Sequence, residues 1–134
     1  MKYFDHSIET MPREGLESLQ IEKLFSMIEI IYGRNRFYTA KLDSAGINPK
    51  ELKTIEDLRN YPLTTKKELV KAQQDDFPFG TNATFEQSDY TRFHQTSGTT
   101  GTPLHVFDTL ESWTWWGNCW GYVLAAAGLT ENDR

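Results

Sequence analysis

The chain has 134 residues, of which 38% are hydrophobic and 25% are charged, a balance typical of a soluble globular domain. The formal net charge of −5 argues against nucleic acid and anionic membranes as partners, because both favour a basic surface. Its one cysteine, Cys119, excludes an internal disulfide, and no apolar run suits a signal peptide or a membrane span, so we expect a cytoplasmic location.

Residues 1–88 are expected to form a helical leader. Apolar side chains recur at helical steps between positions 12 and 32, which predicts an amphipathic helix ended by Gly33. A second helix is expected over 35–45, with Gly46 as its stop signal. Capping patterns beginning at Asn48, Thr54 and Thr65 predict further short helical segments, the last over 66–73, before a loop over 75–84. The expected apolar stripe of the first helix consists of Leu16, Leu19, Leu24, Phe25, Ile28, Ile31 and Tyr32.

Residues 89–134 have a different pattern, which predicts the start of an α/β domain. Bulky and polar residues alternate over 90–95, and a second short strand is expected over 104–107. Thr109 is placed to cap a helix that ends at Gly128, and a strand followed by a helix is half of a βαβ unit. The apolar stripe of this helix is formed by Trp113, Trp116, Trp120, Val123 or Leu124, and Ala127.

The segment between the two expected strands carries the strongest chemical signal. Every residue of 96–102 is Ser, Thr or Gly. Gly98 and Gly101 allow backbone N–H groups to approach a ligand closely, and successive amides in a turn form a nest that suits phosphate. The hydroxyl groups add donors for anionic oxygens. The spacing matches neither Gly-x-x-x-x-Gly-Lys-Ser/Thr nor Gly-x-Gly-x-x-Gly, so a loop of another class is expected to bind a polyphosphate.

Each remaining candidate has a structural and a functional interpretation. The tryptophan stripe is expected to be a buried helix face, with the wall of an acyl pocket as the alternative. His94 is expected to be structural or to support the loop or a ligand. Ser97 lacks the Gly-x-Ser-x-Gly elbow of a nucleophile, and the histidines lack the spacing of metal ligands. The charges of 66–71 are expected to be solvated helix surface.

The sequence around the loop closely resembles the phosphate-binding loop of the adenylate-forming enzymes, and among these the phenylacetate-CoA ligase family. His94, the run Ser97-Gly98-Thr99-Thr100-Gly101 and then Pro103 carry the likeness. Many members of the family have lysine where this chain has Thr102, which leaves the loop one positive charge short. The likeness covers nearly the whole chain through stretches that follow the family's order, among them Met11-Pro12-Arg13, Asn35-Arg36-Phe37-Tyr38, Pro62-Leu63-Thr64-Thr65-Lys66 and Phe77-Pro78-Phe79-Gly80.

The resemblance implies a fold, an activity and a set of site residues. The fold is α/β: a helical leader (1–88), then the first strand, phosphate loop, strand and helix of a large AMP-binding domain (89–134). The activity is ATP-dependent conversion of a carboxylic acid, aromatic by preference, into an acyl-adenylate and then a coenzyme A thioester, with Mg²⁺ as cofactor. His94, Trp113 and Trp116 are expected to support the loop or the acyl pocket. The β- and γ-phosphates of ATP are expected to bind Thr96, Ser97, Gly98, Thr99, Thr100, Gly101 and Thr102.

Family members are several hundred residues long, so we expect this chain to be an N-terminal fragment that is inactive alone. It has no expected catalytic residue, because the family's nucleoside-binding motifs, hinge and catalytic lysine lie beyond Arg134. A truncated gene product, a proteolytic remnant and a deliberately shortened chain are equally compatible with this length. Two alternatives stay open: a non-enzymatic phosphate-binding or interaction module (or an inert remnant), and adenylation without thioester formation. Family members are often dimers, which leaves a homodimer open as well.

Overall fold

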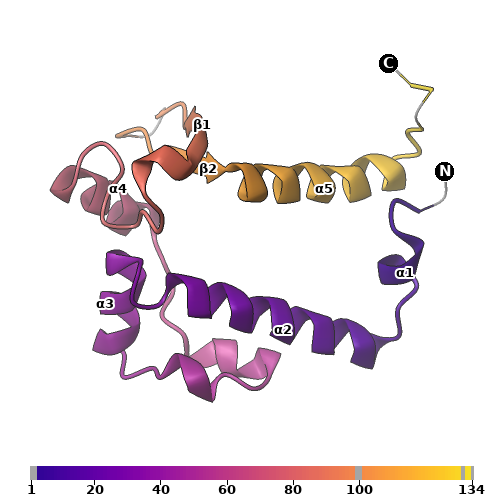
Figure 1. The fold of residues 1–134 in the computed structure, drawn as a ribbon, viewed down its shortest axis with the longest axis horizontal. Coiled ribbons are helices and arrows are strands. Elements are labelled where there is room, and N and C mark those ends of the chain that lie inside the picture. Colours follow the sequence, from indigo (N-terminus) through magenta and orange to yellow (C-terminus); the bar gives the residue numbers. More distant parts are fainter. Residues whose placement is uncertain (1–2, 99–100, 131, 134) are drawn as a thin grey trace.

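The computed structural model describes residues 3–98, 101–130 and 132–133 (Figure 1). Its α-helices are α1 (His6–Glu9), α2 (Arg13–Ile31), α3 (Arg36–Ser44), α4 (Lys66–Asp75) and α5 (Leu110–Ala126). Its strands are β1 (Tyr90–Gln95) and β2 (His105–Thr109), and short 3₁₀ turns are found at η1 (Pro49–Glu51), η2 (Ile55–Asn60) and η3 (Gln87–Asp89).

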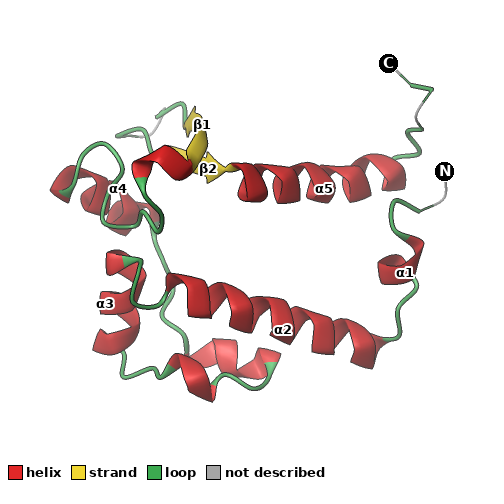
Figure 2. Ribbon diagram, in the orientation of Figure 1, coloured by secondary structure: helices red, strands yellow, loops and turns green. Residues whose placement is uncertain are grey.

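The arrangement is the expected one: a helical leader is followed by a strand, the Ser/Thr/Gly loop, a strand and a helix. Figure 2 shows that β2 runs directly into α5. The strands β1 and β2 pair antiparallel as a hairpin. The strand β1 has its predicted bounds, whereas β2 begins at His105 instead of 104 and continues to Thr109. These helices and the strand pair agree with the α/β class predicted from the sequence.

Local capping signals account for the helix ends. Gly33 and Gly46 follow α2 and α3 with φ angles of +86° and +67°, a region that favours glycine. The Asn35 side chain caps α3 by accepting the Tyr38 N–H at 2.9 Å. The Thr109 hydroxyl accepts the Ser112 N–H at 3.1 Å at the start of α5. The Asn48 signal yields only the short turn η1, not an α-helix.

The segment that leads to the hairpin is held against α3 and α4 by polar contacts. The Asn35 side chain is 2% exposed, and its amide donates to the Asn82 carbonyl at 2.6 Å and to the Thr84 hydroxyl at 2.9 Å. The Tyr90 hydroxyl accepts the backbone N–H of Thr84 at 3.0 Å. These bonds tie the end of the leader to the first residue of β1.

The buried core is small. Its apolar members include Ile28, Leu42, Leu52 and Ala72, and among the described residues of the predicted α2 stripe only Ile28 is buried. The accessible surface is 9989 Å², whereas a compact monomer of 15.5 kDa exposes about 7,200 Å². This chain therefore presents a surface that a self-contained domain of its size would cover.

The helix α5 contributes much of that surface. None of its residues is buried, and Trp116 and Trp120 of the predicted stripe are 48% and 49% exposed. The prediction that the tryptophan stripe is a buried helix face is therefore wrong for this chain. The physical reason is that, in the described part, α5 packs against the hairpin near its start and against Phe4 near its end, and its middle is left open.

Candidate functional site

The Ser/Thr/Gly loop is closed at its base as the turn of the hairpin. Gln95 and His105 are the last paired residues of β1 and β2. One residue further, the Thr96 N–H donates to the Leu104 carbonyl at 3.0 Å, and the Thr96 hydroxyl oxygen accepts the Leu104 N–H at 2.9 Å. Both ends of the loop are thus held in place, which a flexible linker would not provide. A hydroxyl both donates and accepts, so Thr96 keeps a donor for a ligand.

Gly98 occupies a position that no other residue fits. Its φ is +65°, and a Cβ added there would lie 2.9 Å from the Gly101 carbonyl oxygen and 2.9 Å from Pro103 Cγ. The Gly98 carbonyl also accepts the Gly101 N–H at 2.9 Å. Gly101 has a φ of +144° but no atom close to the place of a Cβ. The tight turn therefore depends on Gly98 both for its conformation and for the close approach of Pro103.

The other predicted phosphate ligands are placed only in part. Ser97, Gly101 and Thr102 are exposed, as a loop that contacts a ligand requires. Thr99 and Thr100 lie outside the described residues.

A basic helix face lies across from the loop. A cleft of about 440 Å³ is lined by Gly101 and Thr102 on one side and by α4 on the other, through Lys66, Lys67, Val70, Lys71 and Gln74. Lys66, Lys67 and Lys71 are exposed, as predicted for a solvated helix surface, and all three also line this cleft. The available signal was the spacing of Lys67 and Lys71, which places both on one side of a helix. The sequence pattern alone does not indicate what lies opposite that side of the helix.

The orientation of α4 is set by a buried amide. Gln73, 5% exposed, donates from Nε2 to the His105 carbonyl at 2.7 Å and accepts the His105 N–H at Oε1, at 3.1 Å. His105 lies two residues after Pro103, at the exit of the loop. Gln73 therefore fixes the lysine face of α4 relative to the loop.

An ion pair holds the first turn of α4. Lys41 Nζ of α3 donates to Glu68 Oε1 at 2.6 Å, and the same carboxylate accepts the Thr65 N–H at Oε2, at 2.7 Å. The pKa of Glu68 is lowered from 4.5 to about 2. The hydrogen bond from Lys41 is the largest cause, and the hydrogen bond from the Thr65 backbone is the next largest. Glu68 is therefore ionised at neutral pH and already occupied, and it is not among the residues that line the cleft.

Two of the three residues expected to support the loop or the acyl pocket lie together. The His94 and Trp113 rings stack with centroids 5.0 Å apart and planes at 19°. His94 Nε2 also lies 3.6 Å from Asp108 Oδ2 across the hairpin. Trp116 instead meets Trp120 edge to face at 6.2 Å, farther along α5. These contacts of His94 therefore link β1 to β2 and to α5.

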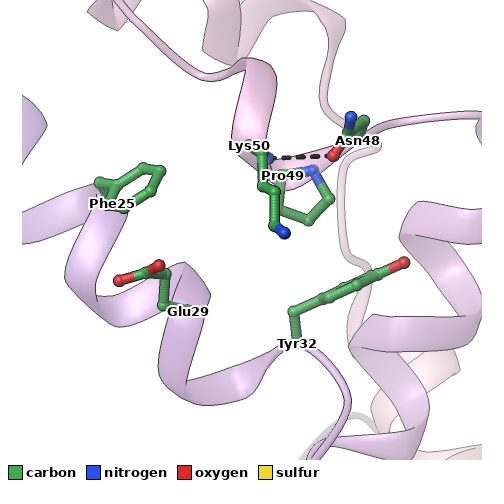
Figure 3. Close-up of a pocket in the computed structure, with 6 residues that line it drawn as sticks. All are labelled: Phe25, Glu29, Tyr32, Asn48, Pro49 and Lys50. Carbon is green, nitrogen blue, oxygen red and sulfur yellow. Dashed lines mark hydrogen bonds between the residues drawn. The ribbon is translucent and has the colours of Figure 1, made fainter.

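A second cavity lies in the leader, away from the loop. Figure 3 shows Phe25 and Tyr32 beside it and Lys50 reaching into it from η1. Its volume is about 170 Å³, which is smaller than the range of about 300–1,000 Å³ usual for ligand sites. Among the described residues no group of three or more His, Cys, Asp or Glu side chains could hold a metal ion, and no helix combines the length and apolar character needed to cross a membrane. The cleft between α4 and the loop is the candidate site because the Ser/Thr/Gly loop and the lysines of α4 line it together.

Comparisons with known proteins identify relatives of the chain. No family model matches the chain. Phenylacetate-coenzyme A ligase of Thermus thermophilus is 38% identical over 125 residues, which are 93% of this chain and 27% of that protein. The enzyme of the same name from Escherichia coli is 35% identical over 95% of this chain and 28% of its own length. The chain belongs to the phenylacetate-CoA ligase family of adenylate-forming enzymes.

Solved structures place the chain in the N-terminal domain of CoA ligases. A structure of 2-hydroxyisobutyryl-CoA ligase in complex with 2-HIB-AMP and CoA, in the thioesterification state, matches 99% of this chain at a TM-score of 0.90 and 27% identity. The same ligase in an open conformation matches with a TM-score of 0.89 and 25% identity. The chain covers 28% and 30% of those two structures, so it corresponds to a part of a phenylacetate-CoA ligase-like protein.

Proposed function

We propose that the chain is the phosphate-binding N-terminal part of an ATP-dependent acyl-CoA ligase. The observation that carries the proposal is the Gly98 turn, fixed between two paired strands and facing the lysines of α4. The curated relatives named phenylacetate-coenzyme A ligase supply the reaction class. The two protein surfaces fit a polyphosphate, because one offers backbone amides and hydroxyls and the other offers ammonium groups.

The loop acts through positioning and charge in this proposal. A carboxylate attacks the α-phosphate of ATP, and the protein must hold the departing pyrophosphate in line while negative charge develops on it. The residues 96–102 bind the β- and γ-phosphates through N–H and O–H donors, and Lys66 at the start of α4 adds a positive charge. The whole enzyme would then transfer the acyl group to coenzyme A.

Further properties of the whole enzyme belong to the same proposal. Mg²⁺ would be carried in with the phosphates, since it is commonly bound through substrate oxygens and water. The acid is proposed to be aromatic, on the strength of the phenylacetate ligases among the relatives. The whole enzyme is also proposed to assemble as a homodimer. Its proposed location is the cytoplasm, because the lone Cys119 suits a reducing compartment. The chain by itself is proposed to bind ATP without forming acyl-adenylate or thioester.

The test is calorimetric titration of the chain with ATP and Mg²⁺, comparing Gly98→Ala with Gly46→Ala. Both glycines have nearly the same φ, +65° and +67°, but only Gly98 has atoms in the way of a Cβ. Gly98→Ala is expected to weaken ATP binding at least about tenfold, because the turn opens and its amides diverge. Gly46→Ala, far from the loop, is expected to keep the affinity of the original chain.

Two results would contradict the proposed function. One is an unchanged affinity for ATP in folded Gly98→Ala. The other is the absence of saturable ATP binding by the original chain when circular dichroism shows that it is folded.

A further inference from the structure

We propose that Lys67 and Lys71 bind the terminal phosphate of the nucleotide across the cleft, and that Asp75 competes with this phosphate for Lys71. The inference rests on the proposed function, and it adds two specific ligands and one internal competitor to the site. It assigns the affinity for the polyphosphate tail to a helix of the leader as well as to the loop.

The loop cannot neutralise a polyphosphate by itself. Residues 96–104 contain no lysine or arginine, so they offer only neutral N–H and O–H donors. The phosphates of ATP carry several negative charges, and hydrogen bonds from charged donors are markedly stronger than those from neutral ones. A cationic partner must therefore come from elsewhere in the chain.

The cleft is lined by the positively charged side chains that the loop lacks. Its seven lining residues include Lys66, Lys67 and Lys71 and no aspartate or glutamate. This separation of charge occurs in a chain with 19 acidic and only 14 basic residues. Lys67 and Lys71 are one helical turn apart, so they lie on the same face of α4, and both line the cleft together with Gly101 and Thr102.

Lys71 already forms an ion pair with Asp75, and a bound phosphate could replace this carboxylate. Its Nζ lies 2.9 Å from each oxygen of Asp75, one turn farther along α4. The two side chains are 72% and 50% exposed, and an exposed pair of this kind contributes little stability. A phosphate in the cleft could therefore draw Lys71 away from Asp75 at small cost. Glu68 does not compete in the same way, because Lys41 and Thr65 already hold its carboxylate.

The experiment is calorimetric titration with three probes at two salt concentrations: ATP–Mg²⁺, inorganic tripolyphosphate and AMP. The Lys67→Ala, Lys71→Ala double variant is expected to bind ATP and tripolyphosphate at least about tenfold more weakly, with a shallower salt dependence. AMP is expected to bind the original chain and the double variant equally weakly, because it has no terminal phosphate to reach α4. Asp75→Asn is expected to bind ATP about two- to threefold more tightly.

Matched controls separate local contacts from net charge. The Lys50→Ala, Lys53→Ala double variant is the control for the cleft lysines, because it removes two positive charges from the leader without touching the cleft. Glu56→Gln is the control for Asp75→Asn, because it removes one negative charge elsewhere in the leader. Both controls are expected to keep the original affinity. Asp75→Asn should fold normally, because a carboxylate at a helix C-terminus opposes the helix dipole.

The outcomes distinguish this inference from the proposed function. Unchanged ATP binding in the double lysine variant, together with weakened binding in Gly98→Ala, would overturn the inference and leave the proposed function standing. The reverse pattern would keep the lysine site and overturn the role of the loop. Equal losses for AMP and ATP in the double variant would overturn the assignment to the terminal phosphate. If Asp75→Asn and Glu56→Gln bind ATP with equal affinity, Asp75 does not compete with the phosphate for Lys71, and that part of the inference is overturned.

Discussion

Gln73 and His105 are joined by two hydrogen bonds, one from each end of the Gln73 amide to the His105 backbone, at 2.7 and 3.1 Å. The two residues are 32 positions apart in the chain. One lies in α4 with the lysines of the cleft, and the other begins β2 at the exit of the loop. The relationship makes the leader a structural part of the candidate phosphate site.

Replacing this amide should affect both stability and binding. Gln73→Leu keeps a side chain of similar size but leaves the His105 N–H and carbonyl without their partner, which should cost about 1–3 kcal/mol of unfolding free energy. Affinity for ATP should fall as well, because α4 is no longer held against the loop. Urea unfolding and calorimetry check the two effects. Gln20→Leu, on the exposed surface of α2, is the control, and an equal response of the two variants would contradict the role given to Gln73.

Acid should weaken the attachment of α4 to α3 through Glu68. The folded-state pKa of this carboxyl is lowered to about 2 from 4.5, so its contribution to stability is fully present above pH 4.5 and is lost as pH falls toward 2. Glu68→Gln should therefore flatten the decline of unfolding free energy between these values. Lys41→Met should also flatten it, because it removes the largest cause of the pKa shift. Parallel pH profiles for the original chain and both variants would show that the pair has no such effect.

Much of the local structure could be predicted because its causes are local. Gly33, Gly46 and Thr109 end or begin their helices through conformations and caps that involve only nearby residues. The bounds of β1 follow from the alternation of its own side chains. The Ser/Thr/Gly composition likewise identified the loop itself.

The wall of the site opposite the loop could not be predicted in this way. Lys67 looks like an ordinary surface lysine until the fold places Gly101 and Thr102 opposite it. Gln73 carries no local pattern that marks it as buried or as a partner of His105. The exposure of Trp116 depends on which elements cover α5, and a helical stripe cannot supply that information.

The open face of α5 should make this chain bind apolar dyes and associate with itself. Trp116 and Trp120 are about half exposed and lie edge to face at 6.2 Å, within a helix that has no buried residue. Exposed apolar patches of this kind mark surfaces that other protein normally covers. Replacing both residues by lysine should lower fluorescence of anilinonaphthalene sulfonate and reduce association in sedimentation velocity, with little change in unfolding free energy.

Trp113 is the matched control for that experiment. Its ring stacks on His94 and is only partly exposed, so Trp113→Lys should lower the unfolding free energy. Dye binding that stays unchanged after both exposed tryptophans are replaced would place the apolar surface elsewhere.

The N-terminal segment packs against α5 through the Phe4 ring, which lies over Gly121. Figure 1 shows α1 beside the carboxyl end of α5. The Phe4 ring packs edge-on against Tyr122, with centroids 4.9 Å apart. A Cβ on Gly121 would lie 2.4 Å from the Phe4 ring, so Gly121→Ala must displace Phe4.

A double-mutant cycle measures this contact. In a helix interior, alanine is more favourable than glycine by about 1 kcal/mol, so Gly121→Ala should stabilise the chain by that amount once Phe4→Ala has removed the ring. With Phe4 present, the gain should be offset or reversed, and the two substitutions should not be additive. Gly117→Ala, in the same helix with no atom within 4 Å of the added Cβ, should stabilise both backgrounds equally. If Gly121→Ala behaves like Gly117→Ala while Phe4 is present, the N-terminal segment is not held on α5 in solution.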